Sequence, residues 1–549
     1  MKPKLTTLTL ILAFIVIAGA VFSLTNARDL GVLAADDSFY YYRTAQHIVA
    51  GDGSTFDGIN FTNGYHPLWM LLLLPIFKFA GGDSELALRL VYALLSIILA
   101  GSMVIYWSFL KKKWGAFAAT AILPFFALPI VLNQFTNGLE SGLLILVLGI
   151  LLWCVDRWDL LPPQNGLARK VALGSLLALL FLCRLDTAFI LIGVATVTCL
   201  FYRVRFWSVP GMVNALKAYW AVLVVFVVLV SPYLLWNRAH TGHMVPISGA
   251  LKSSFPHVEG SLLRAIRPQW APYSIIITAF VIFAVASLLL PTGLLRRQFQ
   301  PGAQADSGIV MLLGIGLGAL MHFTYSVCFT TWGTFSWHFA SYIPLLLFMG
   351  ALVFAWLKVK GLPWVGGAFS TVVLVVAIAG TAWGWNTKKK VHDMWYASAT
   401  WARENTPENA TFGMTDCGYF AYFSHRRTIN LDGLINGYEF QHALTSSDLP
   451  NYFKHCGLDY VCDYEVAANG LPEHFVNLNR ILASEYRKGK RGYQFHLEKS
   501  QALFTSPLYK EYNGRPIQFM IWKYEPQELF EVNSQSTITT TSYAKGKLN

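Results

Sequence analysis

Residues 35–43 read ADDSFYYYR and follow the first long apolar segment of the chain, residues 5–24. Two adjacent acids, Asp36 and Asp37, open this stretch, and Arg43 closes it. Ionisable groups are costly near a bilayer, so paired carboxylates beside a spanning segment favour a functional site at the membrane face. A solvated loop with unrelated acids is the alternative explanation of the same pattern.

The composition indicates an integral membrane protein. Of 549 residues, 55% are hydrophobic and 13% are charged, whereas soluble domains are about 25% charged. The apolar residues gather in separate blocks of the length that crosses a bilayer, about 17 to 25 residues. The net charge of +12 is explained by basic cytoplasmic loops, and we expect no nucleic-acid partner.

The apolar blocks predict a multi-pass α-helical membrane protein with about 11 transmembrane helices. The first two lie at residues 5–24, taken as an uncleaved span, and 85–110, and the others are centred near residues 124, 148, 176, 195, 226, 282, 318, 348 and 373. Basic residues concentrate in the short loops of one side, which predicts a cytoplasmic N-terminus. The run Lys388 to Lys390 lies on the wrong side in this scheme.

The apolar stretch from Pro67 to Ala80 is too short to span. Its 14 residues make a helix of about 21 Å, and a hydrocarbon core is about 30 Å thick. We therefore expect a helix at the outer interface, within a loop of juxtamembrane helices at about 26–83.

The chain changes character near residue 387, where polar residues and turn signals become frequent. We predict a transmembrane module at 1–386 and a soluble extracytoplasmic α/β domain at 387–549 with a disordered Ser/Thr-rich tail. Strand-like pieces lie near residues 411–414 and 517–524. Cys456 and Cys462 are either a short disulfide or free thiols.

Polar residues that interrupt the apolar blocks gather on the predicted outer face. They are Asp36, Asp37, Arg43, His66, Glu140, Arg184, Asp186, Arg238, His240, His243, Lys252, Trp332, Trp337 and His338. Each has a structural alternative: Glu140 as a helix cap, Arg184 with Asp186 as an ion pair, and the tryptophans as an aromatic belt. Their convergence on one face is what favours function.

The mixture of acidic and basic residues suits a reaction in which a hydroxyl group attacks a substrate that carries an anionic group. Arg, Lys and His side chains hold an anion such as a lipid phosphate, and a neighbouring carboxylate can accept the proton of a hydroxyl nucleophile. The sequence contains no G-x-x-x-x-G-K-[ST] motif for ATP. We therefore expect an activated donor carried by a lipid.

The stretches ADDSFYYYRTAQHIVAGDG (35–53) and TFDGINFTNGYHPLW (55–69) resemble the first outer loop of the GT-C superfamily of membrane glycosyltransferases. That group includes protein O-mannosyltransferases, the lipid A aminoarabinose transferase and arabinofuranosyltransferases. Glu140 matches a second acid of the family, which is more often Asp, and His66-Pro67 stands at its basic-Pro pair.

The resemblance implies an inverting glycosyltransferase in a bacterial inner membrane, with a polyprenyl-phosphate sugar as donor at the outer (periplasmic or lumenal) face. Its acceptor is a glycan, lipid or protein. Asp36 is then the general base, and Glu140 holds sugar or acceptor hydroxyls. Asp37 positions the acceptor, the sugar or a divalent cation; no other cofactor is expected, and metal dependence stays open.

The remaining candidates bind substrate. His66, Arg184, Arg238 and Lys252 are the candidates for the donor phosphate. The candidates for sugar or lipid contacts are Tyr40, Tyr41, Arg43, Asp186, His240, His243, Trp332, Trp337 and His338. The alternative functions are a transporter or flippase of a glycolipid or lipid-linked sugar, which predicts internal repeats and charges at mid-depth, and a carbohydrate-binding sensor.

Overall fold

The computed structural model describes residues 26–202, 204, 208–260, 262–268, 270–289, 305–330, 335–464, 482, 491–510 and 516–533. The predicted first span and the predicted tail lie outside these ranges.

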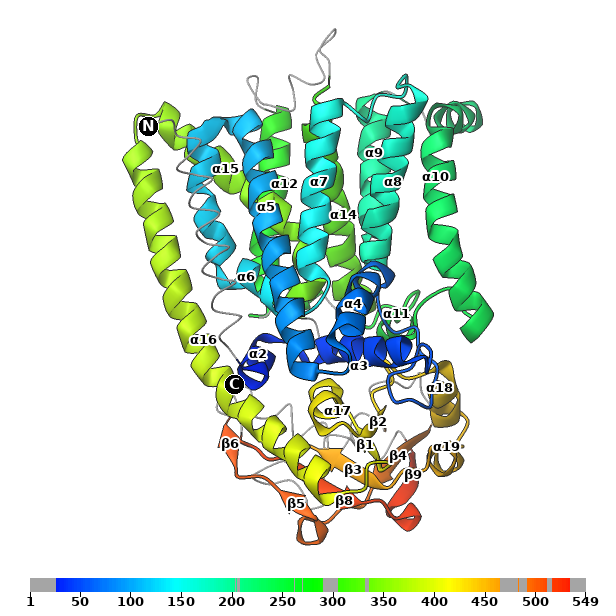
Figure 1. Cartoon of the computed structure of the whole chain (residues 1–549). Helices are drawn as coiled ribbons and strands as arrows, with labels where there is room; N and C mark the ends of the chain where they lie inside the picture. Colours follow the sequence, from blue (N-terminus) through cyan, green and yellow to red (C-terminus); the bar gives the residue numbers. More distant parts are fainter. Residues whose placement is uncertain are drawn as a thin grey trace.

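Long apolar helices form the larger part of the molecule and run side by side (Figure 1). They are α5 (Ser84–Ala121), α7 (Ser141–Trp158), α8 (Leu167–Cys183), α9 (Ala188–Phe201), α10 (Val209–Thr241), α12 (Ala271–Leu289), α14 (Ser307–Phe329), α15 (Ile343–Val359) and α16 (Pro363–Asn405). In the described ranges, six are long and apolar enough to cross a membrane: α5, α7, α10, α12, α14 and α15 with the preceding turn η4 (Ser336–Tyr342). The chain is an integral membrane protein, and the count of 11 spans stays a prediction.

The single helix predicted near residue 124 is wrong, because this part of the chain is broken into pieces. Helix α5 turns at Gly115, whose φ of 84° is open to glycine without strain. A 3₁₀ turn η1 (Leu123–Ala127) and helix α6 (Pro129–Thr136) follow. Prolines 124 and 129 lack an N–H and restrict the residue before them, which ends each helix.

Short helices lie between the bundle and the C-terminal domain. They are α2 (Ala27–Leu33), α3 (Asp36–Ala50), α4 (Pro67–Ala80) and α11 (Ile247–Lys252), with turns η2 (Leu185–Thr187) and η3 (Leu262–Ile266). Helix α3 lies across the direction of the long helices (Figure 1). Helix α4 has the predicted bounds, and it starts at Pro67, a favoured first position.

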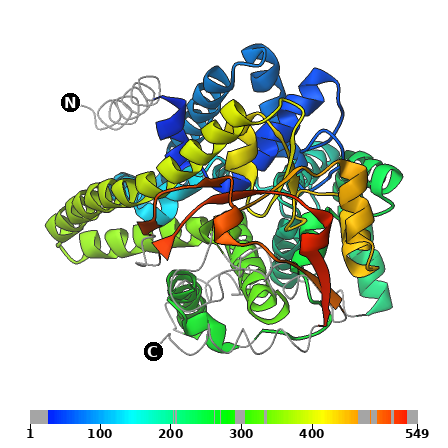
Figure 2. The ribbon, with the colours of Figure 1, turned by 90° about the horizontal axis from the view of Figure 1, so that it is seen from below.

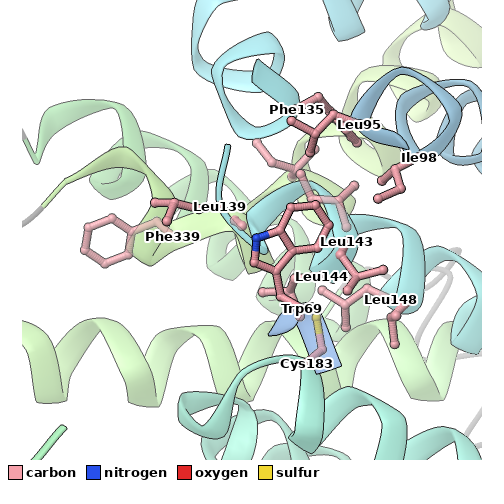
Figure 3. Close-up of a cluster of buried hydrophobic side chains, with 14 of the residues drawn as sticks. Trp69, Leu95, Ile98, Phe135, Leu139, Leu143, Leu144, Leu148, Cys183 and Phe339 are labelled. Carbon is pink, nitrogen blue, oxygen red and sulfur yellow. The ribbon is translucent and has the colours of Figure 1, made fainter. Parts of the chain in front are cut away.

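Trp69 fixes helix α4 to the bundle. Its side chain is fully buried among Leu143, Leu144 and Leu148 of α7 (Figure 3). Its indole N–H donates to the carbonyl of Gly138 at 3.2 Å. Burying such a large ring stabilises the contact by about 2 to 3 kcal/mol, so α4 is held at one place beneath α7.

The C-terminal domain contains a five-stranded sheet in the order β2-β1-β3-β8-β5. Strands β1 (Thr411–Met414), β2 (Arg427–Asn430) and β3 (Tyr460–Asp463) are parallel, and β8 (Met520–Lys523) runs antiparallel to β3 and to β5 (Phe504–Thr505). Two-stranded pairs are β4 (Arg491–Phe495) with β9 (Leu529–Asn533) and β6 (Tyr509–Lys510) with β7 (Pro516–Ile517). The helices are α17 (Gly418–Ser424), α18 (Tyr438–Thr445) and α19 (Leu449–Cys456), with turns η6 (Lys499–Gln501) and η7 (Pro526–Glu528).

One hydrophobic core joins the bundle to this domain. It runs without a break from helices such as α7 and α14 through Phe39 of α3 to Tyr419 and Phe420 of α17. Seen from below, the yellow-to-red elements of the C-terminal domain lie over the end of the bundle (Figure 2). Helix α16 passes from the bundle through the predicted boundary at residue 386 into the domain. The cysteines 456 and 462 are free thiols.

Candidate active site

Helix α3 presents its two acids to different neighbours. Successive residues of a helix point about 100° apart. The carboxylate of Asp36 accepts the backbone N–H groups of Gly418 at 2.9 Å and Tyr419 at 2.7 Å. Asp37 instead lines a cavity of about 400 Å³ between the bundle and the C-terminal domain. The two acids are therefore not equivalent.

Both acids titrate above the usual range of an aspartate. Burial raises the pKa of Asp36 to about 7, against the lowering effect of its two backbone hydrogen bonds. Burial also raises the pKa of Asp37 to about 6. The positive charge of Lys252 lowers the pKa of Asp37, and the carboxylates of Asp432 and Glu140 raise it.

The cavity brings together most of the residues that the sequence analysis selected. Asp37, Tyr40 and Tyr41 come from α3, and the others come from distant segments of the chain. They are His66, Glu140, Arg184, Asp186, Lys252, Trp337 and His338.

Arg184 is held by a network of buried groups. Its guanidinium donates to Glu140 at 3.1 Å, to Asp186 at 3.1 and 2.6 Å, and to the carbonyl of Trp337 at 2.8 Å. Only 3% of Arg184 is exposed. Two carboxylates therefore neutralise this cation, as the ion-pair alternative anticipated for Asp186.

Glu140 orients the neighbouring groups. Its second oxygen accepts the hydroxyl of Tyr41 at 2.9 Å, and Nε2 of His66 lies 3.7 Å from its first oxygen. The Tyr41 hydroxyl also accepts the backbone N–H of His66 at 3.0 Å. Burial lowers the pKa of His66, which favours a neutral imidazole. The side chain of Glu140 does not cap its own helix α7.

The tight turn before Glu140 requires a glycine. Gly138 has a φ of 80°, and a Cβ there would lie 2.4 Å from the Tyr42 hydroxyl and 2.8 Å from Ser38. Gly138 also accepts hydrogen bonds from Tyr42 and Trp69. This close packing fixes the position of Glu140 relative to α3.

Lys252 differs from Arg184 because its charge is not neutralised by contact. It lines the cavity at the end of α11. In the described part of the chain, no carboxylate lies within 4.0 Å of its ammonium group. It is thus available to an anionic ligand.

Several predicted residues lie away from the cavity. Asp36 faces α17, Arg43 donates to Gln46 at 3.1 Å, and Arg238 is exposed on α10. His240 stacks on Phe61 at 5.2 Å, and His243 stacks on Tyr438 at 4.0 Å. Trp332 lies outside the described residues.

Several cavity residues were not predicted, and His322, Tyr325 and Leu434 are among them. His322 is buried on α14, with Nε2 3.6 Å from Asp186, and an ionisable residue inside an apolar span is a signal that could have identified it. Tyr325, one turn later, and Leu434 of the C-terminal domain also line the cavity. Leu434 carries no sequence signal, because its position follows from domain packing.

The predicted divalent cation has no matching ligand cluster. No group of three or more His, Cys, Asp or Glu side chains in the described ranges is arranged to hold a metal ion. Both oxygens of Asp36 accept backbone N–H groups, which leaves them poorly placed as ligands. Metal binding by Asp36 and Asp37 stays a prediction.

A family model and a curated relative each match a part of the chain. A family model described as a domain of unknown function (DUF8728) matches residues 384–510. A terminal β-(1→2)-arabinofuranosyltransferase from Mycobacterium tuberculosis is 30% identical over 133 residues, which are 23% of this chain and 21% of that protein. The chain thus matches about a fifth of the length of this relative.

Solved structures resemble almost the whole chain. ArnT from Cupriavidus metallidurans, bound to undecaprenyl phosphate, has a TM-score of 0.53 and 13% identity, covering 94% of this chain and 97% of ArnT. The oligosaccharyltransferase from Archaeoglobus fulgidus has a TM-score of 0.47 and 15% identity, covering 83% and 69%. The likeness to ArnT shows that the chain has the GT-C fold, as the first loop predicted.

Proposed function

We propose that this chain is an inverting glycosyltransferase that moves a sugar from a polyprenyl-phosphate donor to an acceptor hydroxyl. The observation that carries the proposal is a cavity between the bundle and the C-terminal domain, in which the carboxylate of Asp37 and the unneutralised cation Lys252 are brought together. A base and an anion-binding group are the two functions that this reaction requires.

We assign the general base to Asp37 in place of Asp36. Support comes from the position of Asp37 on the cavity and from its pKa of about 6. A base with a raised pKa takes a proton more readily than an ordinary aspartate and is still ionised at neutral pH. Asp36, by contrast, has both oxygens engaged by α17.

The reaction is a single displacement. The acceptor oxygen attacks the anomeric carbon and forms the new glycosidic bond, while its proton passes to Asp37. The bond between the anomeric carbon and the phosphate oxygen breaks, and its electron pair leaves with the lipid phosphate. Lys252 stabilises the negative charge that grows on this phosphate.

The hydrogen bonds of Arg184 fix the positions of other side chains in the site. Arg184 has two carboxylate partners, so we assign it to hold Glu140 and Asp186 in place. Glu140 and Tyr41 then present fixed polar groups to sugar or acceptor hydroxyls. The aromatic rings of Tyr40, Tyr325 and Trp337 offer faces on which a sugar or an isoprenoid chain packs.

We place the cavity at the extracytoplasmic face. Lys112 and Lys113, in the run from Lys111 to Lys113, pair with Asp156 near the end of α7 that is farther from Glu140, and α7 runs away from the C-terminal domain (Figure 1). The positive-inside rule assigns that end to the cytoplasm. Two of the three proteins compared above come from bacteria, which supports a bacterial inner membrane for this chain. ArnT with its undecaprenyl phosphate supports a polyprenyl-phosphate donor, and the arabinofuranosyltransferase supports a glycan as acceptor.

The test is sugar transfer from a radiolabelled polyprenyl-phosphate sugar by the purified full chain in nanodiscs. Asp37→Asn keeps size and shape but cannot accept the proton, so we expect transfer to fall by about 10²- to 10⁴-fold while donor binding persists. Asp52→Asn is the matched control, since Asp52 is exposed at the end of the same helix. Transfer by Asp37→Asn at the wild-type rate would end the assignment of the base. A wild-type chain that binds the lipid without releasing its phosphate would favour a transporter.

A further inference from the structure

The N–H groups at the start of α17 are capped by a residue from the other end of the chain. The residue that precedes α17, Cys417, makes no side-chain cap. Asp36 supplies it, with one oxygen on Gly418 N–H and the other on Tyr419 N–H. Hydrogen bonds to an ionised acceptor are about twice as strong as neutral ones, so this contact ties the C-terminal domain to helix α3.

The two backbones approach so closely that position 418 must be glycine. A Cβ on Gly418 would lie 2.3 Å from the carbonyl oxygen of Asp36 and 3.1 Å from Cβ of Phe39. Beside this contact, the ring of Phe39 packs on Tyr419 at 5.1 Å and on Tyr422 at 5.2 Å. Apart from the partly exposed carboxylate of Asp36, the contact is therefore tight and apolar.

A second polar contact lies one turn further along α3. The hydroxyl of Tyr40 donates to Asp432 at 3.3 Å and accepts from the side-chain amide of Asn430 at 3.1 Å. Asp432 also accepts the backbone N–H groups of Asp416 and Leu434. Leu434 lines the cavity, so this part of the domain forms one wall of the site.

The spacing of these residues divides α3 into two faces. Asp36 and Phe39 occupy positions i and i+3 and meet the C-terminal domain. Tyr40 lies at the border of the two faces, because it bonds to Asp432 of that domain and also lines the cavity. Asp37 and Tyr41 occupy an i, i+4 pair and line the cavity. Residues at these spacings share one side of a helix. Fixing the first face therefore sets the direction of the second.

We propose that the C-terminal domain is required for the activity of the site and that Asp36 is a positioning residue. Asp36 clamps this domain to α3, and this contact makes Asp37 face the cavity. The inference rests on the proposed function, and it gives a role to the region matched by the model of unknown function. Asp36 acts through α17 and α3, and it does not touch substrate.

The experiment compares the same substitution at adjacent residues. Asp36→Asn loses the charge and leaves only one acceptor for two N–H groups, whereas Asp37→Asn leaves the clamp intact. In the full chain in nanodiscs, hydrogen exchange of the peptide 417–423 should become about 10- to 100-fold faster in Asp36→Asn and stay unchanged in Asp37→Asn. We expect kcat of Asp36→Asn to fall by about 10²-fold with little change in donor KM, because Lys252 is untouched.

A second variant tests the clamp without changing a carboxylate. Gly418→Ala should reproduce the faster exchange and the lower kcat, because its Cβ forces the two backbones apart. Gly413→Ala is the matched control in the same domain, since the nearest atoms to its Cβ are the flexible side-chain ends of Leu431 and Leu458, at 3.0 Å. It should leave exchange at 417–423 and transfer unchanged.

Two results would overturn the proposal. Wild-type exchange in Asp36→Asn together with a loss of transfer as large as that of Asp37→Asn would mean that Asp36 acts on substrate directly. Fast exchange with wild-type kcat would mean that turnover does not need the clamp. A wild-type chain that shows Asp36-dependent protection but transfers no sugar would support the clamp and overturn only the proposed function.

Discussion

At the scale of single residues, the charges around Asp37 predict the pH dependence of transfer. Asp37 must be ionised to accept a proton, and its pKa is about 6. We expect kcat/KM to rise with pH through the pKa of Asp37 and through that of Asp36, about 7, because the contact of Asp36 with α17 also needs an ionised carboxylate, and to level off above both values. Lys252 lowers the pKa of Asp37, so Lys252→Met should move the part of the acid limb that reports Asp37 to higher pH as well as weaken donor binding. Lys360→Met, at an exposed position between α15 and α16, is the control. An unmoved limb in Lys252→Met would contradict the assignment of Asp37.

Arg184 predicts an effect on stability. Arg184→Met removes the cation from the buried Glu140 and the partly exposed Asp186, and loss of one partner of a buried pair such as Arg184 with Glu140 costs about 3 to 5 kcal/mol. We expect a markedly lower temperature of thermal unfolding in detergent, partly restored by adding Asp186→Asn. Arg157→Ala, exposed at the end of α7, should be neutral. A stable Arg184→Met with weaker donor binding would instead support the role in phosphate binding that the sequence suggested.

The sequence alone does not show which of Asp36 and Asp37 faces the cavity. The ADDSFYYYR stretch identified both acids, and the 3.6-residue period says only that they point in different directions. Which direction meets the cavity depends on Gly418 and Tyr419, more than 380 residues later in the chain. No local pattern carries that information.

At the scale of elements, the change of direction inside helix α5 requires a glycine at position 115. Gly115→Ala puts a Cβ at a φ of 84°, where the backbone is strained although the surrounding space is open, and such strain costs about 1 to 3 kcal/mol. Gly367→Ala is the matched control, because it also meets nothing within 4 Å and lies inside helix α16, where alanine is favoured by about 1 kcal/mol. Thermal unfolding should therefore shift in opposite directions in the two variants. Equal shifts would contradict the strain at Gly115.

Hydrophobic pattern and length predicted helix α4 well and the crossing near residue 124 poorly. Pro67 and the Gly81-Gly82 pair mark both ends of α4 in the sequence. Near residue 124 the apolar run is long enough for a helix, but the prolines inside it prevent one continuous helix. Within the run Lys388 to Lys390, Lys389 pairs with Asp29 of α2 at 3.2 Å, which gives one of the three lysines a structural role.

At the scale of the whole molecule, the orientation in the membrane gives a direct test. In a background without the native cysteines, Glu439→Cys lies exposed on α18 and Gln164→Cys lies exposed between α7 and α8. We expect an impermeant thiol reagent to label residue 439 in intact cells and residue 164 only after permeabilisation. Labelling of residue 164 from outside would reverse the orientation and place the cavity in the cytoplasm.

The GT-C fold could be predicted from the first loop, and the charged residues of the cavity could be predicted because they interrupt apolar runs. His66, Glu140, Arg184 and Lys252 were all selected in this way. Arg238 and His240 satisfied the same criterion but extend along the surface of α10. A polar residue reaches the cavity only if it lies at the right position along its helix and points to the right side of it. Both depend on packing, which a single sequence does not show.

The core shared by the bundle and the C-terminal domain has a consequence for biosynthesis. Phe39 and Tyr42 are made early, yet their partners Tyr419 and Tyr422 are among the last quarter of the chain to leave the ribosome. Tyr42 can pack on Phe77 of α4 before then, but the side of α3 that meets α17 stays uncovered, and exposed apolar surface of this kind is what makes a folding intermediate prone to aggregate. We therefore expect a chain interrupted after its last membrane helix to be degraded more readily than the full chain.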